Sequence, residues 1–441
     1  MTFSMSFAFF YFNLFMLLDR TIAPDFKVIN SIHLPETQSF SLDNGIPLHV
    51  INIGEQPVIR LEVIFDAGNW YEKEQGTSFF AVKMMTEGTS RLPSSEISEA
   101  FDILGAFIEM THSSDRSGIV VYCLSRFLAD VLSLVSELIN DSTFPEKELS
   151  DLRNITLQNL RVNREKTAYI ASTELRAVLF GKTHPYGQSL DEEVIQSLSL
   201  ASIKHYFEQF IKSGSCTVML AGQVSQEAAD QVNAFLGQNS NMQKVDHVSN
   251  ISESVYAGLE ILIEKEESVQ SSIRLGRRLF NRHHEDYFKM IVTNEILGGY
   301  FGSRLMKNIR EEKGLTYGIS SSVVTLANDG YFMIGTDVKK EFTQQTIDEI
   351  KKEIYRLQTE LVGEEELQTV KNFMAGEFAG SLNTAFDVAD RRKILFLDGL
   401  PADFFNQYID QIHATTAEDI QNMASKYLRP EDMAEVVVGG K

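Results

Sequence analysis

The same order of predicted secondary-structure elements occurs twice along the chain. The first series has a strand region at 43–65, helices at 76–87 and from Ser94, a hairpin at 106–124, and helices at 127–140 and 146–166. The second series has strands at 259–264 and 270–279, helices at 285–297 and 303–312, a hairpin at 317–338, and helices at 340–358, 363–381 and 384–397. Hairpins followed by runs of helices are typical of an α+β fold.

The repeat predicts two homologous domains, each an antiparallel sheet packed with helices. We place the N-terminal domain at 34–235 and the C-terminal domain at 256–441, after an apolar segment and lead-in at 1–33. Residues 236–255 are polar and aperiodic, which indicates a linker. A duplicated domain with a long linker commonly has a cleft between its halves.

Composition narrows the classes of partner. The 441 residues carry a net charge of −21, whereas nucleic acids and anionic membranes bind clustered Lys and Arg, so we expect neither as a partner. Cys123 and Cys216 lie in apolar runs that are typical of buried strands, where cysteine acts as a small hydrophobic residue. Without a disulfide framework, a reducing compartment fits best, and the cytoplasm is favoured.

The first 18 residues are uncharged and apolar, about the length of a minimal membrane span. They lack the basic start and the small-residue cleavage site of a signal peptide. One interpretation is that translation starts at Met16 and that the preceding stretch is not native protein; we favour it. The other is a genuine export or anchor segment, which would make the protein periplasmic or membrane-associated.

The histidines do not form a helix-borne zinc motif. No two of the nine are three or four residues apart, whereas such a site needs two imidazoles one helical turn apart. We interpret the one cluster, His283-His284-Glu285, as a solvated helix start, with metal binding as the minor alternative. The glycine-rich stretch 298–303 lacks the ending of a phosphate-binding loop and indicates a tight turn between helices.

Several short motifs occur in a characteristic order from about residue 40 onward. They are Asp66–Glu72, Gly76–Met84, Glu87–Thr89, Thr143–Glu146, His184–Gly187 and Val218–Val224, followed by Gln270–Gly276, Leu297–Leu305 and Ile309–Tyr317. Together they resemble a subunit of the pitrilysin/insulinase (inverzincin) metallopeptidases, the short-chain class that includes mitochondrial processing peptidase and paired bacterial peptidases. The resemblance implies two homologous α+β domains per chain and a clamshell of four such domains, of which this chain forms half.

The zinc motif of that family is lost here. Active members carry H-x-x-E-H between positions matching Gly76 and Gly88-Thr89, and the resemblance puts the two histidine ligands on Phe79 and Lys83 and the glutamate base on Val82. The third ligand, a glutamate, falls on Asn159. Phe and Val can neither ligate zinc nor take a proton, and Lys83 places a cation where the metal would sit. We therefore expect no catalytic zinc in this chain and no hydrolysis by it alone.

The second half keeps a feature that the resemblance links to substrate binding. In active members an Arg and a Tyr with six residues between them reach the substrate backbone at the zinc, and Arg310 and Tyr317 match that spacing. A guanidinium and a phenol can hold an oxyanion and nearby backbone groups. The alternative is an ordinary surface arginine paired with neighbouring acids, such as Glu311, and a strand tyrosine. With the resemblance, the substrate-binding interpretation is preferred.

The resemblance implies a non-catalytic, zinc-less subunit of a heterodimeric peptidase. A homologous partner with an intact zinc motif would supply zinc, and this chain would supply Arg310, Tyr317 and a chamber wall for the hydrolysis of unfolded peptides. The alternative is a non-enzymatic peptide-binding or scaffold protein of the same fold. A homodimer with a re-invented site is a third, less favoured hypothesis.

Overall fold

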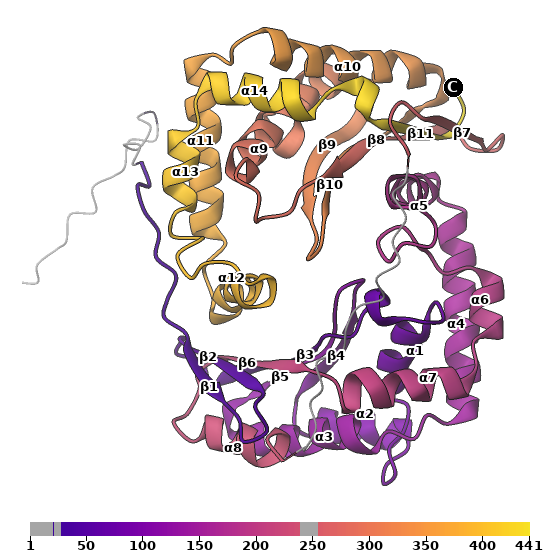
Figure 1. Cartoon of the computed structure of the whole chain (residues 1–441), viewed down its shortest axis with the longest axis vertical. Coiled ribbons are helices and arrows are strands. Elements are labelled where there is room, and N and C mark those ends of the chain that lie inside the picture. The colour runs from indigo at the N-terminus through magenta and orange to yellow at the C-terminus, as the bar shows by residue number, and fades with distance from the viewer. Residues whose placement is uncertain (1–20, 22–27, 239–254) are drawn as a thin grey trace, which may run out of the picture.

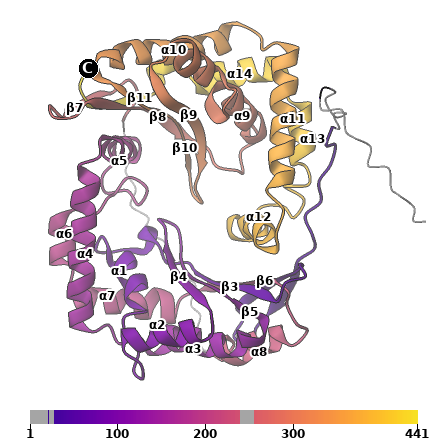
Figure 2. The ribbon, with the colours of Figure 1, turned by 180° about the vertical axis from the view of Figure 1, so that it is seen from behind.

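The computed structural model describes residue 21 and residues 28–238 and 255–441. Two β-sheets and their helices form an open ring, with one sheet in each half (Figures 1 and 2). The apolar segment 1–18 and almost all of the predicted linker 236–255 lie outside the described residues.

The N-terminal sheet has the strand order β1-β2-β6-β3-β5-β4. Its strands are β1 (Gln38–Ser41), β2 (Pro47–Asn52), β3 (Val58–Phe65), β4 (Phe107–His112), β5 (Ser117–Leu124) and β6 (Cys216–Gly222). The sequence of β3, Val-Ile-Arg-Leu-Glu-Val-Ile-Phe, is rich in β-branched residues and is buried along nearly all its length, as a central strand requires. The predicted placement of both cysteines in buried strands, β5 and β6, is confirmed.

The C-terminal sheet has the order β7-β11-β8-β10-β9. Its strands are β7 (Glu260–Glu264), β8 (Gln270–Leu279), β9 (Thr316–Thr325), β10 (Gly330–Lys339) and β11 (Ala434–Gly439). Apart from β1, the two sheets have the same connectivity, so the predicted pair of homologous α+β domains is confirmed. The expectation of purely antiparallel sheets needs one correction, because β2 pairs with β6 and β7 pairs with β11 in parallel. In both pairs the two strands, β2 with β6 and β7 with β11, come from distant parts of their half of the chain.

Helices cover the outer faces and the rim of the ring (Figure 1). In the first half they are α1 (Thr77–Met84), α2 (Ser94–Ile103), α3 (Leu128–Asp141), α4 (Glu146–Arg164), α5 (Thr167–Phe180), α6 (Glu192–Ser197), α7 (Leu200–Tyr206) and α8 (Ala228–Leu236). In the second half they are α9 (Tyr287–Asn294), α10 (Thr343–Thr359), α11 (Glu364–Gly380), α12 (Ala385–Asp398), α13 (Tyr408–Ala414) and α14 (Ala417–Tyr427). The helices predicted at 340–358, 363–381 and 384–397 match α10, α11 and α12 to within three residues.

One helix of each half packs on the sheet of the other half. Helix α5 lies against the C-terminal sheet, where Nε of Arg274 donates to Oγ of Ser172 at 3.0 Å. Helix α12 lies against the N-terminal sheet, and its Val388 and Ala389 share a buried cluster with Met219 of β6. Figure 1 shows both helices on the inner side of the ring. This exchange joins the two halves through apolar contacts as well as polar ones.

Buried charges join α12 to β3. The Arg60 guanidinium contacts Asp390 through both Nη atoms, at 3.2 and 2.9 Å, and Glu62 at 2.6 Å. Lys393 completes the group with contacts of 2.8 Å to Glu62 and 3.0 Å to Asp390. Arg60 and Glu62 are both buried, so their charges depend on these partners for compensation.

Candidate functional site

Helix α1 carries the three positions that the resemblance assigns to the H-x-x-E-H motif, Phe79, Val82 and Lys83. It starts after Gly76, whose φ of 89° is accessible at low cost only to glycine. Val82 is buried in the N-terminal core, and Phe79 packs against that core with its ring edge-on to His112 at 5.7 Å. Two of the three positions therefore serve apolar packing.

Lys83 bonds to the neighbouring edge strand. Its Nζ lies 2.6 Å from the main-chain carbonyl of Met110 on β4, the last strand of the sheet. The hairpin of β4 and β5 closes with a bond from the N–H of Ser113 to the carbonyl of Arg116. Because bonded pairs alternate along an antiparallel ladder, the Met110 carbonyl points away from β5. Lys83 therefore caps an acceptor on the free edge of the sheet.

A chain of hydrogen-bonded polar groups lies near Lys83, with Ser78 buried and Glu72 and His112 partly buried. Oγ of Ser78 lies 2.6 Å from Nε2 of His112 and donates to Oε1 of Glu72 at 2.5 Å. Burial, and then the charge of Lys83, lower the pKa of His112 to about 4, so its imidazole is neutral at pH 7. Burial raises the pKa of Glu72, although hydrogen bonds from Ser78 and Gln188 oppose this rise. The contact between these groups was not predicted from the sequence, although Glu72 and Ser78 lie in two of the motifs quoted above, Asp66–Glu72 and Gly76–Met84.

Asn159, which the resemblance assigns to the third ligand, lies exposed on α4. An amide oxygen is a poor replacement for a zinc-binding carboxylate. Among residues 28–238 and 255–441, no cluster of three or more His, Cys, Asp and Glu side chains is arranged to hold a metal ion. The residues present at Phe79, Val82, Lys83 and Asn159 do not fit zinc.

Arg310 and Tyr317 lie close in sequence on different elements. Arg310 is in a π-helical segment, Met306–Glu312, with its guanidinium carbon 4.5 Å from the centre of the exposed Phe301 ring. Tyr317 is near the start of the edge strand β9 and is 94% exposed. It borders an open groove of about 540 Å³ between α5 and strands β8–β10, which Arg274 and Asp337 also line. Arg310 does not line this groove in the described part of the chain.

Two family models match the chain in succession. Residues 50–190 match the model described as insulinase (peptidase family M16), and residues 197–374 match the model described as the peptidase M16 inactive domain. The chain belongs to peptidase family M16. The resemblance proposed from the sequence motifs is thereby confirmed.

Similar proteins include both a named protease and a named non-peptidase. The chain is 23% identical to an uncharacterized zinc protease, YmxG, of Bacillus subtilis, over 90% of this chain and 97% of that protein. It is 22% identical to the non-peptidase homolog YmxG of Helicobacter pylori, over 85% and 87%. A further relative is the rat mitochondrial-processing peptidase subunit beta, 20% identical over 92% and 85%, which is by its name one subunit of an assembly.

A solved structure supports the same assignment. The crystal structure of a peptidase M16 inactive domain from Pseudomonas fluorescens aligns with a TM-score of 0.82 and 25% identity, over 92% of this chain and 98% of that one. With the zinc motif replaced, this M16 chain is an inactive homologue. Within the described residues no helix is long and apolar enough to cross a membrane.

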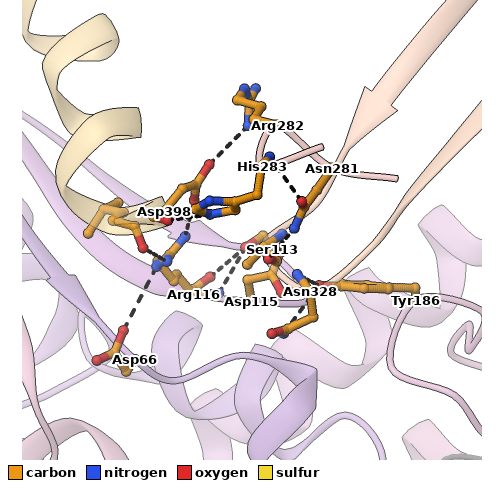
Figure 3. A network of polar contacts seen from close by, with 12 residues as sticks. Asp66, Ser113, Asp115, Arg116, Tyr186, Asn281, Arg282, His283, Asn328 and Asp398 are labelled. Carbon is orange, nitrogen blue, oxygen red and sulfur yellow. Dashed lines mark hydrogen bonds and ion pairs between the residues drawn. The ribbon is translucent and has the colours of Figure 1, made fainter. Parts of the chain in front are cut away.

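In this M16 chain a polar network connects the two halves (Figure 3). The hydroxyl of Tyr186 donates to Asp115 at 2.6 Å and accepts from the N–H of Asn328 at 3.1 Å. Arg116 reaches Asp398 at 3.4 Å, and Arg282 reaches the same carboxylate at 3.0 Å. The loop between β4 and β5 is thus bonded to the turn between β9 and β10 and to the end of α12.

The same network contains His283, one of the two adjacent histidines for which the sequence predicted a solvated helix start. Nε2 of His283 lies 2.8 Å from the carbonyl of Asp398 (Figure 3). His284 stacks on Phe280 with ring centres 4.0 Å apart. Both imidazoles therefore make structural contacts, and helix α9 starts only at Tyr287.

Proposed function

We propose that this chain is the non-catalytic, zinc-less subunit of a heterodimeric M16 peptidase. A homologous partner with an intact H-x-x-E-H motif would hold zinc and cut unfolded peptides. This chain would supply Arg310 and Tyr317 from its C-terminal domain together with one wall of the chamber. The finding that best supports the proposal is the difference between the two sheet edges: Tyr317 is 94% exposed on β9, whereas Lys83 caps β4.

The exposed edge suits an extended peptide. Peptides bind sheet edges by adding a strand, with main-chain hydrogen bonds giving affinity. The groove beside Tyr317 offers both signs of charge, with Asp337 and Arg274 3.4 Å apart in an ion pair. The 94% exposure of Tyr317 has no packing explanation within this chain, but a side chain that reaches toward a partner's substrate would need such exposure.

Reconstitution tests the proposal. The chain is mixed with the zinc-bearing homologue from the same organism, and cleavage of an unfolded fluorogenic peptide is measured for wild type, Arg310→Ala and Tyr317→Phe. Both variants should lower kcat/KM by about ten-fold or more, since each removes one donor to the transition state.

The chain offers matched controls. Arg126 also lies over a phenylalanine ring, that of the half-buried Phe127, at 4.7 Å, and Tyr355 is an exposed tyrosine on α10. Arg126→Ala and Tyr355→Phe should leave cleavage unchanged. Equal rates for all four variants would reject the roles given to Arg310 and Tyr317.

The alternative is a peptide-binding or scaffold protein with no hydrolysis in its assembly. The similarity to a non-peptidase homolog is the observation in its favour. Co-purification from the native host, followed by mass spectrometry, distinguishes the two hypotheses. A co-purifying M16 chain with an intact zinc motif supports the peptidase subunit, and an assembly without such a chain supports the scaffold.

The cytoplasm is our proposed location. The free, buried thiols of Cys123 and Cys216 are compatible with a reducing compartment. Cell fractionation with a periplasmic marker enzyme tests this, and release of the chain with that marker would contradict it.

A further inference from the structure

A small pocket of about 250 Å³ lies in the C-terminal half, away from the lost zinc site. It is formed where α9, α11, α12 and α13 meet, and α9 continues at this point into a π-helical segment, Glu295–Gly299. Single π-helical turns inside α-helices occur frequently at functional sites. In Figure 1, α9 and α12 lie on the inner side of the ring.

Asn294 is the buried polar residue of this pocket. It is 8% exposed, and its Oδ1 has no hydrogen-bond partner in the described structure. A buried acceptor without a donor is costly, because it has given up its bond to water. Since Asn294 lines the pocket, a ligand that donates a hydrogen bond would satisfy this atom.

Two carboxylates lie beside Asn294. Glu295 follows it directly, and Glu377 on α11 lines the same pocket. In the described part of the chain, no hydrogen bond or ion pair reaches either carboxylate group. Burial, and then the charge of Glu377, raise the pKa of Glu295 to about 7. The pocket therefore has two acids and no cation bound to them.

The glycine that ends the π-helical segment leaves space for the Glu295 carboxylate. A Cβ atom at Gly299 would lie 2.4 Å from Oε2 of Glu295 and 3.1 Å from Nδ2 of Asn294. Any larger residue at 299 would displace the acid. This gives a way to move the carboxylate without removing its charge.

Aromatic rings form another part of the wall. Phe378, Phe405 and Tyr408 line the pocket, and Arg391 lies over the rings of Phe378 and Phe405 at 5.6 and 5.8 Å. Arg391 also donates to Oγ of Ser381 at 3.1 Å. Arg282, the other basic residue of the wall, pairs with Asp398. Both arginines are thus engaged with groups other than Glu295 and Glu377.

We propose that this pocket binds a protonated primary amine. The ammonium group would donate to Oδ1 of Asn294 and to the carboxylates of Glu295 and Glu377, and its carbon chain would contact the aromatic wall. A single ammonium satisfies three acceptors at once, which matches its three N–H donors. Aromatic faces add to the attraction for an organic cation. A lysine side chain, a peptide amino terminus and a free amine share this chemistry.

Binding to the isolated, full-length chain tests the proposal. The probe is n-butylammonium, with n-butanol as its neutral counterpart, and the readout is saturation-transfer NMR at pH 8. We expect the amine to bind at least ten-fold more tightly than the alcohol, and Glu295→Gln to weaken the amine by about ten-fold. Gly299→Ala should weaken it too, because it displaces the carboxylate.

Two further variants protect the test from a folding defect. Glu377 is exposed, so Glu377→Gln should fold normally and weaken amine binding about three-fold. Glu418, an exposed acid on α14, gives the control Glu418→Gln, which should bind like wild type. Equal binding of amine and alcohol, or wild-type amine affinity in both Glu295→Gln and Glu377→Gln, would overturn the proposal.

Competition by peptides identifies the source of the amine. If a lysine side chain is the natural ligand, a peptide with one free lysine and a blocked amino terminus should displace butylammonium. If a peptide amino terminus is the natural ligand, a peptide whose one free amine is its amino terminus should displace it. Displacement by the peptide with both amines acetylated would contradict an amine site. Because no partner or cleavage is involved, the outcome is independent of the peptidase-subunit proposal.

Discussion

Nζ of Lys83 donates a 2.6 Å hydrogen bond to the main-chain carbonyl of Met110, so a residue that the resemblance assigns to a zinc-ligand position caps the edge of the sheet beside it. The same lysine supplies a positive charge near the partly buried His112, which is hydrogen-bonded through Ser78 to Glu72.

Lys83→Met should expose the β4 edge. The variant keeps the apolar stem and removes the donor, so the Met110 carbonyl becomes available to an added strand. We expect a loss of about 1 kcal/mol in the free energy of unfolding, because a single partly exposed bond is removed, and a gain in affinity for an extended peptide. Fluorescence polarisation with a labelled peptide measures the second effect, and Lys83→Arg, which keeps the charge, is the control. Unchanged peptide affinity in Lys83→Met would refute the capping role.

The imidazole of His112 should respond to the same substitution. Removing the Lys83 charge takes away one of the two causes of its low pKa, and burial remains. In Lys83→Met the pKa of His112 should rise from about 4 but stay below 6.5, as measured by NMR titration of the ring protons. Because the folded-state pKa lies below the unfolded-state value, the unfolded chain binds the extra proton first. Stability should therefore fall as the pH drops from about 6.5 toward 4, less steeply in the variant.

Arg60→Ala should be strongly destabilising. The substitution leaves the buried Glu62 with Lys393, 2.8 Å away, as its remaining basic partner, so the cost should approach but not exceed the value of about 3–5 kcal/mol for breaking a buried ion pair. The denaturation midpoint in urea measures the effect. Arg161 pairs with Glu192 on the surface at 2.6 Å, and Arg161→Ala should leave the midpoint almost unchanged. A similar midpoint for both variants would show that the Arg60 group does not hold α12 on its sheet.

Glu295→Gln should change how stability depends on pH. Since the folded-state pKa of Glu295 is about 7 and the unfolded-state value is near 4.5, the folded chain binds the proton more tightly between these values. Wild-type stability should decline by about 1–2 kcal/mol as pH rises from 5 to 8, after allowance for partial exposure of the group. The glutamine side chain of the variant cannot ionise, so its free energy of unfolding should lack this decline with pH. Parallel pH profiles for the two proteins, obtained by urea denaturation, would contradict the assignment.

The sequence predicted the repeated elements well because they depend on local patterns. The hairpin turn at Ala327–Gly330 and the long amphipathic helix α10 are specified by nearby residues. The parallel pairing of β6 with β2 was not predicted, since about 160 residues separate the two strands. An apolar helix face also does not reveal which sheet it will cover, so the positions of α5 and α12 were not foreseen.

The site was predictable only where a motif marks it. The absence of two histidines one helical turn apart can be read from the sequence, whereas the assignment of ligand positions to Phe79 and Lys83 comes from the resemblance and stays a prediction. The bond from Lys83 to Met110 joins residues 27 apart in sequence, and the pocket at Glu295 joins the helices α9, α11, α12 and α13 over more than a hundred residues. Such arrangements depend on tertiary packing, which no local pattern encodes.

The crossed packing of α5 and α12 bears on how this chain could be divided. If the chain were divided between the two repeats, each fragment would keep its sheet. The N-terminal fragment would lack α12 and the C-terminal fragment would lack α5, so apolar surface of each sheet would be exposed to water. Each fragment would therefore depend on the other to become soluble and ordered. The repeated α+β domain is thus smaller than the unit that folds, which is the pair of domains together.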